Sequence, residues 1–203
     1  MTKISFQVTY APILGNESRI MKSCNSIIKL GIVDEVVIIG FCNVNLKRRD
    51  KLSQNINVIR IPLWIRMYTF KKSMLSKVVA GISILQYFIG IIYYALKTKP
   101  NYISCHNAQT LPACVLAKLF SGAILIYEPH ELEAERAGLG KFGQIIVKII
   151  ERKFLRFCYK VITVCEPISD YYLSEYALPN NKVLTIRNVP INPFLGKNFP
   201  KTN

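Results

Sequence analysis

The sequence predicts an α/β fold with one doubly wound, mainly parallel sheet of the Rossmann-like kind. Short runs rich in β-branched residues alternate along the 203 residues with longer segments whose apolar residues recur at helical spacing. Most of the short runs are apolar without interruption, as in parallel strands that are buried on both faces. The only two histidines follow two of these runs, and open α/β sheets bind their ligands at the carboxyl ends of such strands. The length is sufficient for a real core and favours one domain.

The expected strands are short, rich in Val, Ile and Tyr, and separated by turn-forming residues. They comprise residues 4–10, 36–41, 56–61, 102–105, 124–128, 161–165 and 183–187. The first begins near the N-terminus, which lacks the long apolar region and the small-residue cleavage site of a secretory signal.

Helical patterns fill most of the intervals between these strands. They are expected over residues 17–30, 110–120, 141–159 and 167–176. Gly31 and Gly122 follow the first two patterns and can end them, whereas Pro112 and Pro167 fit a first helical turn. Because crossovers between parallel strands place helices beside the sheet, this order predicts a sheet covered on both faces.

The segment from 77 to 99 allows three interpretations. Between residues 78 and 96 the only polar residues besides Tyr are Ser83 and Gln86, and lysines flank both ends. About 20 apolar residues can cross a bilayer, so a transmembrane span is the first interpretation. A buried crossover helix is the second, because the segment joins two expected strands of one sheet. In the third, the helix packs on the sheet with one face and rests on a membrane surface with the other.

The chain is strongly basic, with a formal net charge of +15 that is concentrated in its middle. Residues 36–127 contain twelve Lys or Arg and one acidic residue, Asp50, whereas residues 128–203 contain eleven and eight. Such a field attracts nucleic acid or anionic lipid, and the basic runs at 47–51 and 71–72 suit adsorption to lipid. A basic module without enzymatic activity, associated with membranes or nucleic acid, is therefore an alternative. No helix-turn-helix, aromatic RNA platform or zinc spacing supports the nucleic-acid version.

Several kinds of site find no support in the sequence. The six cysteines form no CxxC pair, so free thiols in a reducing cytoplasm are expected instead of a zinc site or disulfides. No glycine-rich dinucleotide loop or phosphate loop follows an expected strand, and no Gly-x-Ser-x-Gly turn is present. We therefore expect neither a metal nor a bound cofactor.

Both histidines have a plainer interpretation as hydrogen-bonded structural residues. For His106, the neighbouring Cys105 and Asn107 indicate a packed turn. For His130, the acidic residues around it can be an ordinary solvated start of a helix, where acids favour the dipole. These acidic residues are Glu128, Glu131, Glu133 and Glu135.

Three stretches in order carry a family resemblance. They are NESRIMKSCNSIIKLGIVDEVVIIGF, NYISCHNAQTLPACVLAKLFSGAILIYEPHELEAER and KVITVCEPISDYYLSEYALPNNKVLTIRNVP, and they resemble the N-terminal half of family 4 glycosyltransferases with the GT-B fold. The resemblance implies a hexosyltransferase type of enzyme that moves a sugar from a nucleotide donor to an acceptor with retention and without a required metal. It also implies two Rossmann-like domains that face a cleft, the N-terminal one holding mainly the acceptor.

The resemblance assigns roles to seven residues. His130 is expected to be the catalytic residue, beside the transferring sugar, where its imidazole can hydrogen-bond a hydroxyl. Glu131, His106 and Asn107 are expected to bind the acceptor. His106-Asn107 matches a His-Asp pair of the family, and Asn in place of the acid removes a negative charge.

The donor sugar nucleotide is expected to contact Gly15, Asn16 and Asn188. In the family the loop after the first strand approaches the donor phosphates. The usual pair of glycines is reduced here to Gly15 alone, which makes a close approach of the backbone to a phosphate less favourable.

The resemblance covers one of two halves. We expect residues 1–189 to form the acceptor-binding domain and residues 190–203, with their three prolines, to be an interdomain linker. The C-terminal nucleotide-sugar-binding domain is expected to be absent, and with it the cations that stabilise a diphosphate leaving group, so the chain alone is expected to be inactive.

The expected partners follow from the charge and from the family. They are a nucleotide sugar, a lipid-linked or saccharide acceptor, an anionic membrane surface, and the missing domain or a partner subunit, with no nucleic acid. The expected place is the cytoplasm, peripherally at the inner face of the cell membrane, in the assembly of a surface polysaccharide such as a capsule.

Overall fold

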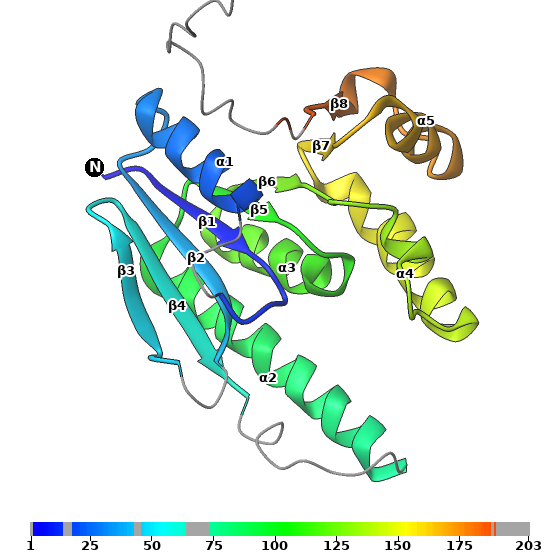
Figure 1. Cartoon of the computed structure of the whole chain (residues 1–203), viewed down its shortest axis with the longest axis horizontal. Coiled ribbons are helices and arrows are strands. Elements are labelled where there is room, and N and C mark those ends of the chain that lie inside the picture. Colours follow the sequence, from blue (N-terminus) through cyan, green and yellow to red (C-terminus); the bar gives the residue numbers. More distant parts are fainter. Residues whose placement is uncertain (1, 14–17, 43–45, 64–73, 188, 190–203) are drawn as a thin grey trace, which may run out of the picture.

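The computed structural model describes residues 2–13, 18–42, 46–63, 74–187 and 189, and within these ranges it has one eight-stranded sheet and five α-helices (Figure 1). The strands are β1 (Ile4–Val8), β2 (Glu35–Cys42), β3 (Arg49–Ser53), β4 (Ile56–Pro62), β5 (Tyr102–Cys105), β6 (Ile124–Tyr127), β7 (Lys160–Thr163) and β8 (Val183–Thr185). All seven expected strands are among them. The prediction of a Rossmann-like α/β sheet is therefore confirmed.

The strand order creates a crevice at one point of the sheet. The order is β3-β4-β2-β1-β5-β6-β7-β8, and every pair is parallel except β3 with β4. From β1 the chain winds outwards to β2 and β4, then returns to the other side of β1 to add β5. Neighbouring connections therefore leave β1 and β5 in opposite directions, and the carboxyl ends of these two strands form the topological switch point where such sheets bind ligands.

Strand β3 was not predicted from the sequence. It pairs with β4 in antiparallel fashion at the edge of the sheet, with Ser53 opposite Ile56 at the turn. Its sequence, RDKLS, has no apolar alternation, so only its neighbour reveals it. Part of the basic run at 47–51 forms this edge, where charged side chains discourage pairing with another chain. Its expected adsorption to lipid stays a prediction.

The helices are distributed unevenly over the two faces of the sheet. They are α1 (Ser18–Lys29), α2 (Met74–Thr98), α3 (Leu111–Ser121), α4 (Lys141–Phe154) and α5 (Glu166–Glu175). In Figure 1, α1 lies on one side of the sheet and α2 and α3 lie on the other. Gly31 and Gly122 follow α1 and α3 with φ of +66° and +75°, a left-handed conformation that suits glycine and ends both helices as expected.

Two apolar cores reflect this distribution. The larger lies between the sheet and α2 to α5, and it contains Phe6 and Val8 of β1 together with Tyr87 of α2. The smaller lies under α1, where Cys24 packs against Ile38. Helices lie on both faces of the sheet, as predicted, although among the described helices α1 alone packs on its face. All six cysteines are free, as expected, and four of them are buried.

Helix α2 is the crossover from β4 to β5, so the second interpretation of that segment is confirmed for its topology. The helix is much less buried than a crossover helix inside the core would be. The stretch Val78–Thr98 has the length and composition of a helix that could cross a membrane, and 22% of its apolar window is buried. The outer face of α2 is therefore an apolar surface that no described part of the chain covers.

Candidate functional site

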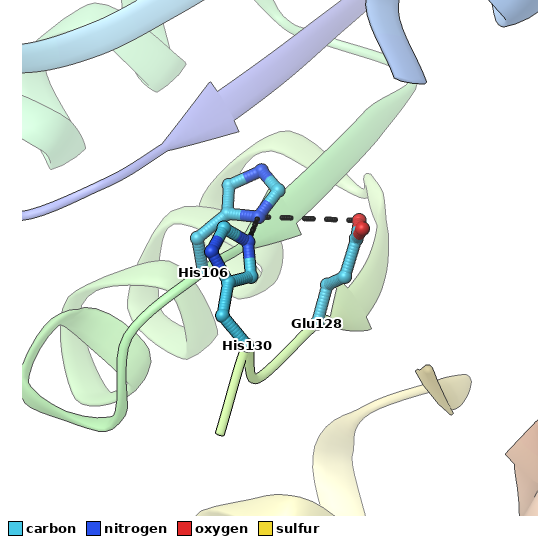
Figure 2. A group of neighbouring side chains, drawn as sticks. All are labelled: His106, Glu128 and His130. Atoms are coloured by element: carbon cyan, nitrogen blue, oxygen red, sulfur yellow. Dashed lines mark hydrogen bonds and ion pairs between the residues drawn. The ribbon is translucent and has the colours of Figure 1, made fainter. Parts of the chain in front are cut away.

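Both histidines stand where the sequence placed them, at the carboxyl ends of neighbouring strands. His106 follows β5 directly, and His130 lies three residues after the end of β6. Strands β5 and β6 are adjacent and parallel, so the two side chains meet at one edge of the sheet, next to the switch point. Figure 2 shows the two rings and the carboxylate of Glu128 pointing toward one another.

A chain of hydrogen bonds fixes the state of the two rings. The Gln7 side-chain nitrogen donates to Ser5 Oγ at 3.2 Å and to Ser104 Oγ at 3.4 Å, so Gln7 Oε1 faces His106 Nε2 at 2.8 Å. Because a carbonyl oxygen only accepts, His106 carries its proton on Nε2, and its Nδ1 is an acceptor. His130 Nε2, 3.1 Å away, therefore donates to that Nδ1.

This row of hydrogen bonds leaves one nitrogen of His130 available. Its Nδ1 has no hydrogen-bond partner among the described residues, and in this tautomer it is an acceptor. His106 is completely buried, whereas His130 reaches the solvent. The ring that is open to a ligand is therefore that of His130, and the buried ring orients it.

Burial keeps both rings neutral. It lowers the pKa of His106 to about 3, with a smaller contribution from the guanidinium of Arg19. Burial also lowers the pKa of His130 to about 4, with His106 and Arg19 adding to the effect and Glu128 opposing it. The Nδ1 of His130 is consequently a hydrogen-bond acceptor at neutral pH and a weak proton acceptor.

Glu128 and Arg19 form the charged side of the cluster. Arg19 Nε donates to Glu128 Oε1 at 3.1 Å, and both side chains are largely buried, with exposed fractions of 13% and 9%. The other oxygen, Oε2, lies 3.9 Å from His106 Nδ1. Arg19 belongs to α1 and Glu128 follows β6, so this pair connects the helix on one face of the sheet to the loop that carries His130.

Glu133 holds the same loop from its other end. It begins a 3-10 turn, Glu133–Glu135, and is 3% exposed. Its Oε2 lies 3.9 Å from Arg136 Nη1, and burial raises its pKa to about 7, an effect that Arg136 and the nearby backbone N–H of Ala108 oppose. The interpretation of residues 128 to 135 as a solvated helix start was wrong for Glu128 and Glu133, because both are buried and bonded.

Asn107 has a structural task that its sequence position did not reveal. Its Oδ1 accepts hydrogen bonds from Thr9 Oγ1 at 3.0 Å and from the backbone N–H of Tyr10 at 2.8 Å. It therefore ties the loop after β1 to the loop after β5 across the switch point. Asn107 was expected to bind the acceptor, and its side-chain oxygen already has these two partners.

The remaining predicted residues fall into two groups. Glu131 is exposed beside His130 and forms no hydrogen bond or ion pair within the described ranges, so it is free to meet a ligand. Gly15, Asn16 and Asn188 lie outside the described residues, and their expected contacts with a donor stay predictions.

The cluster also has the composition of a metal site. The possible ligand atoms of His106, Glu128 and His130 all lie within 4.8 Å of one another. In the present geometry the two rings bond each other, and Arg19 balances the charge of Glu128. The expectation that the chain uses no metal stays a prediction.

A hollow of about 400 Å³ opens beside the cluster, between α1 and the face of the sheet that α1 leaves uncovered. Its lining includes Gln7, Arg19 and Glu128 of the cluster, apolar side chains such as Ile126 and Ile162, and further polar residues such as Lys22 and Arg187. The described apolar face continues outward to Leu184 and Ile186, which are 45% and 56% exposed.

Four residues of the site were not predicted from the sequence. Gln7, Arg19, Glu128 and Glu133 act through contacts with segments far away in the chain. A signal existed for Gln7, because Ser5, Gln7 and Thr9 put polar residues on one face of an otherwise buried strand. No comparable signal distinguishes Arg19 from the other basic residues of its helix.

The family model of Glycosyltransferase Family 4 matches residues 36–189. No curated protein sequence is similar enough to count as a match. Among solved structures, sucrose-phosphate synthase from Thermosynechococcus elongatus is similar with 12% identity and a TM-score of 0.65, covering 91% of this chain and 48% of the enzyme. The lipopolysaccharide outer core galactosyltransferase WaaB is similar with 13% identity and a TM-score of 0.63, covering 94% of this chain and 47% of WaaB.

A glycosyltransferase from Rickettsia africae is similar with 18% identity and a TM-score of 0.57, covering 92% of this chain and 43% of that enzyme. The chain thus spans about half the length of these three enzymes. At these identities the structures establish the fold, which is that of the N-terminal half of GT-B glycosyltransferases. The family model matches well over half of the residues, and the chain belongs to glycosyltransferase family 4.

Proposed function

We propose that this chain is the acceptor-binding half of a retaining hexosyltransferase, which transfers a sugar from a nucleotide-sugar donor to a lipid-linked glycan in the assembly of a surface polysaccharide such as a capsule. The observation that carries this proposal is the open Nδ1 of His130. It is held at the carboxyl end of β6 by a bond from its other nitrogen to a buried ring. Family membership supplies the reaction class, and this geometry supplies a group that can recognise a sugar.

His130 is the proposed catalytic contact. A neutral Nδ1 accepts a hydrogen bond from a sugar hydroxyl near the bond that is exchanged, and it orients that hydroxyl without carrying a charge. Glu131, adjacent and exposed, is proposed to bind hydroxyls of the acceptor. His106 is proposed to act through His130 as a positioning residue, and Asn107 to hold the switch point together.

The proposed reaction needs a second half. In the GT-B arrangement a nucleotide sugar lies between two domains, and cations on the second domain stabilise the diphosphate that leaves. The uncovered apolar face around Ile186 supports a partner domain, since 56% of that side chain is exposed beside the hollow. We therefore propose that the isolated chain has little or no transferase activity, that its donor contacts include Gly15, Asn16 and Asn188, and that no metal takes part.

The proposed location is the cytoplasmic face of the cell membrane, where a lipid-linked acceptor is found. The formal charge of +15 supports attraction to anionic lipid. A further clue is the similarity of the fold to WaaB, a galactosyltransferase of the lipopolysaccharide outer core.

The experiment supplies the chain with a nucleotide-binding half and then measures sugar transfer. The DNA directly downstream is sequenced for a second Rossmann-like domain, which is coexpressed with the chain. If none is encoded, the chain is fused to the nucleotide-binding half of the Rickettsia africae glycosyltransferase. Radiolabelled UDP-glucose, UDP-galactose and UDP-N-acetylglucosamine are supplied with a membrane lipid extract. We expect label in the lipid fraction with the completed enzyme and none with the chain alone.

Robust transfer by the chain alone would refute the proposal that a second half is needed for activity. If the completed enzyme hydrolyses the donor and no label enters the lipid fraction, the proposal of a lipid-linked acceptor is refuted. In that case saccharides in the soluble extract are tested next with the same labelled donors.

A further inference from the structure

Helix α2 presents an apolar stripe to the solvent along most of its length. The exposed side chains are Val78, Ile82, Leu85, Ile89, Tyr93 and Leu96. Their spacing of three and four residues places them on one face of the helix, over a length of about 27 Å at 1.5 Å per residue. Leu85 and Ile89 near the centre are 58% and 60% exposed.

The opposite face of α2 is attached firmly to the sheet. Tyr87 is completely buried, and its hydroxyl donates to the backbone oxygen of Thr9 at 2.7 Å and of Ile39 at 3.0 Å. Gly90 lies so close to Ile61 that a Cβ there would be 2.6 Å from Ile61 Cδ1. A helix that crossed a bilayer would lose these contacts and leave two strand ends apart, so the attachment favours a helix that stays on the domain.

Helices α3 and α4 extend the apolar surface. Helix α2 contacts α3, and α3 contacts α4, on the same side of the sheet. Their exposed apolar side chains are Leu116, Leu119 and Phe120 on α3 and Phe142, Ile145, Ile146 and Ile149 on α4. In the described part of the chain, thirteen of the twenty exposed large apolar side chains lie on these three helices. That concentration is more than a scatter of single residues and marks an interaction surface.

The charged residues of the three helices are basic with one buried exception. Their sequences contain seven Lys or Arg and one acidic residue, Glu151. Glu151 is buried, and the hydroxyls of Tyr127, Tyr172 and Tyr176 donate to its carboxylate. The outer surface therefore presents apolar side chains with basic neighbours and no carboxylate from these helices. This combination is complementary to the acyl region and the anionic headgroups of a bilayer.

We infer that the outer surface of α2, α3 and α4, called here the three-helix face, docks on an anionic bilayer with α2 lying along the membrane plane and not across it. Apolar side chains enter the boundary between headgroups and acyl chains, and the lysines and arginines bind the headgroups. This inference deepens the proposed function by naming the surface that meets the membrane, and it rests on the lipid-linked acceptor only for its biological purpose. Binding itself needs no sugar transfer.

The test measures binding of the purified chain to vesicles by sedimentation. The vesicles are phosphatidylcholine alone or with about one third phosphatidylglycerol, at low and high salt. The variant Leu85→Glu/Ile89→Glu places two charges at the centre of the three-helix face. The control variant Leu30→Glu places one charge at an apolar residue that is more exposed still, at 73%, and that follows α1 on the other side of the sheet. Circular dichroism confirms that each variant is folded.

We expect the chain to bind the anionic vesicles and to bind neutral vesicles much more weakly. High salt should weaken binding, the double variant should lower the partition constant by more than about tenfold, and Leu30→Glu should change it by less than about twofold. A third variant, Leu119→Glu on α3, should give an intermediate loss. Carbonate extraction should release the chain from membranes, because it does not span them.

Three results would overturn the inference. The first is an absence of binding to anionic vesicles. The second is equal binding by the double variant and the control. The third is a wild-type dimer in light scattering that the double variant dissociates, without vesicle binding, which would make the three-helix face a contact between two copies. Because no substrate is present in these measurements, a failure here leaves the transferase assay unaffected, and a failure of that assay leaves vesicle binding unaffected.

Discussion

His106 and His130 end neighbouring strands and touch each other, yet they are prepared for different tasks. His106 is completely buried, and both of its ring nitrogens have partners, Gln7 Oε1 and His130 Nε2. His130 reaches the solvent, and within the described part of the chain only one of its nitrogens has a partner. The difference shows how a fold can use one imidazole to set the orientation and the tautomer of another. Substitutions of the two rings and of the residues that hold them test this difference.

Removal of the open ring should have the largest effect. In the completed enzyme, His130→Ala should lower kcat/KM by about 100-fold, because a hydrogen bond to a sugar hydroxyl at the reacting centre is lost. The measurement is initial transfer rate with radiolabelled donor. His130→Gln, which retains an acceptor of similar reach, is the matched variant and should recover part of the rate. Unchanged turnover in His130→Ala would remove this residue from the mechanism.

The buried ring should make the stability of the chain depend on pH. The pKa of His106 is lowered to about 3 in the folded chain, whereas an unfolded histidine titrates near 6.5. Below pH 6.5 the unfolded chain therefore binds more protons, and the stability from this group is lost as the pH falls from about 6.5 toward 3. At pH 5 the expected loss from this ring is about 2 kcal/mol relative to pH 7.5.

Glu133 opposes the loss of stability at low pH, so a variant is needed to isolate the contribution of His106. The pKa of Glu133 is raised to about 7, and its contribution to stability increases as the pH falls from 7 toward 4.5. Urea unfolding of the wild type and of His106→Gln at both pH values separates the two, because Glu133 is present in both chains. An equal change in the free energy of unfolding for the two chains would contradict a neutral buried His106.

Gln7 should affect rate through the two rings. Gln7→Leu leaves the buried Nε2–H of His106 without an acceptor, which should lower stability by roughly 1–3 kcal/mol. The tautomer is then no longer fixed, so we expect about a tenfold fall in kcat with little change in KM in the completed enzyme. Gln7→Glu restores the acceptor, and its carboxylate should raise the pKa of His106 and shift the pH profile of kcat. A purely structural role predicts normal kcat in Gln7→Leu once the variant is folded.

Asn107 should give the smallest effect when its oxygen is kept. Asn107→Asp preserves the acceptor for Thr9 Oγ1 and for the Tyr10 N–H, so the free energy of unfolding should change by less than about 0.5 kcal/mol. Asn107→Ala loses both bonds and should be less stable by about 1–2 kcal/mol. Thermal unfolding of the two variants at neutral pH distinguishes these outcomes. A large loss in the Asp variant would show that the amide nitrogen has a task of its own.

The sequence was a good guide wherever a local pattern determines the structure. Apolar runs located seven strands, and the ends of two runs located both histidines. Strand β3 escaped because its polar sequence is a strand only through its pairing with β4. Gln7, Glu128 and Glu133 escaped for a similar reason: each acts through a partner distant in sequence. The exposed face of α2 was only one of three interpretations left open, because periodicity cannot tell which apolar residues a neighbouring sheet will cover.

A buried neutral ring holds His130 with one acceptor nitrogen that none of the described residues bonds. Long-range proton–nitrogen correlation spectra of the uniformly labelled chain test it most directly, since only two imidazoles contribute signals. We predict that both rings carry the proton on Nε2 and stay neutral when the pH is lowered from 7.5 to about 5. A ring that titrates near pH 6.5, or nitrogen shifts averaged between two tautomers, would contradict it.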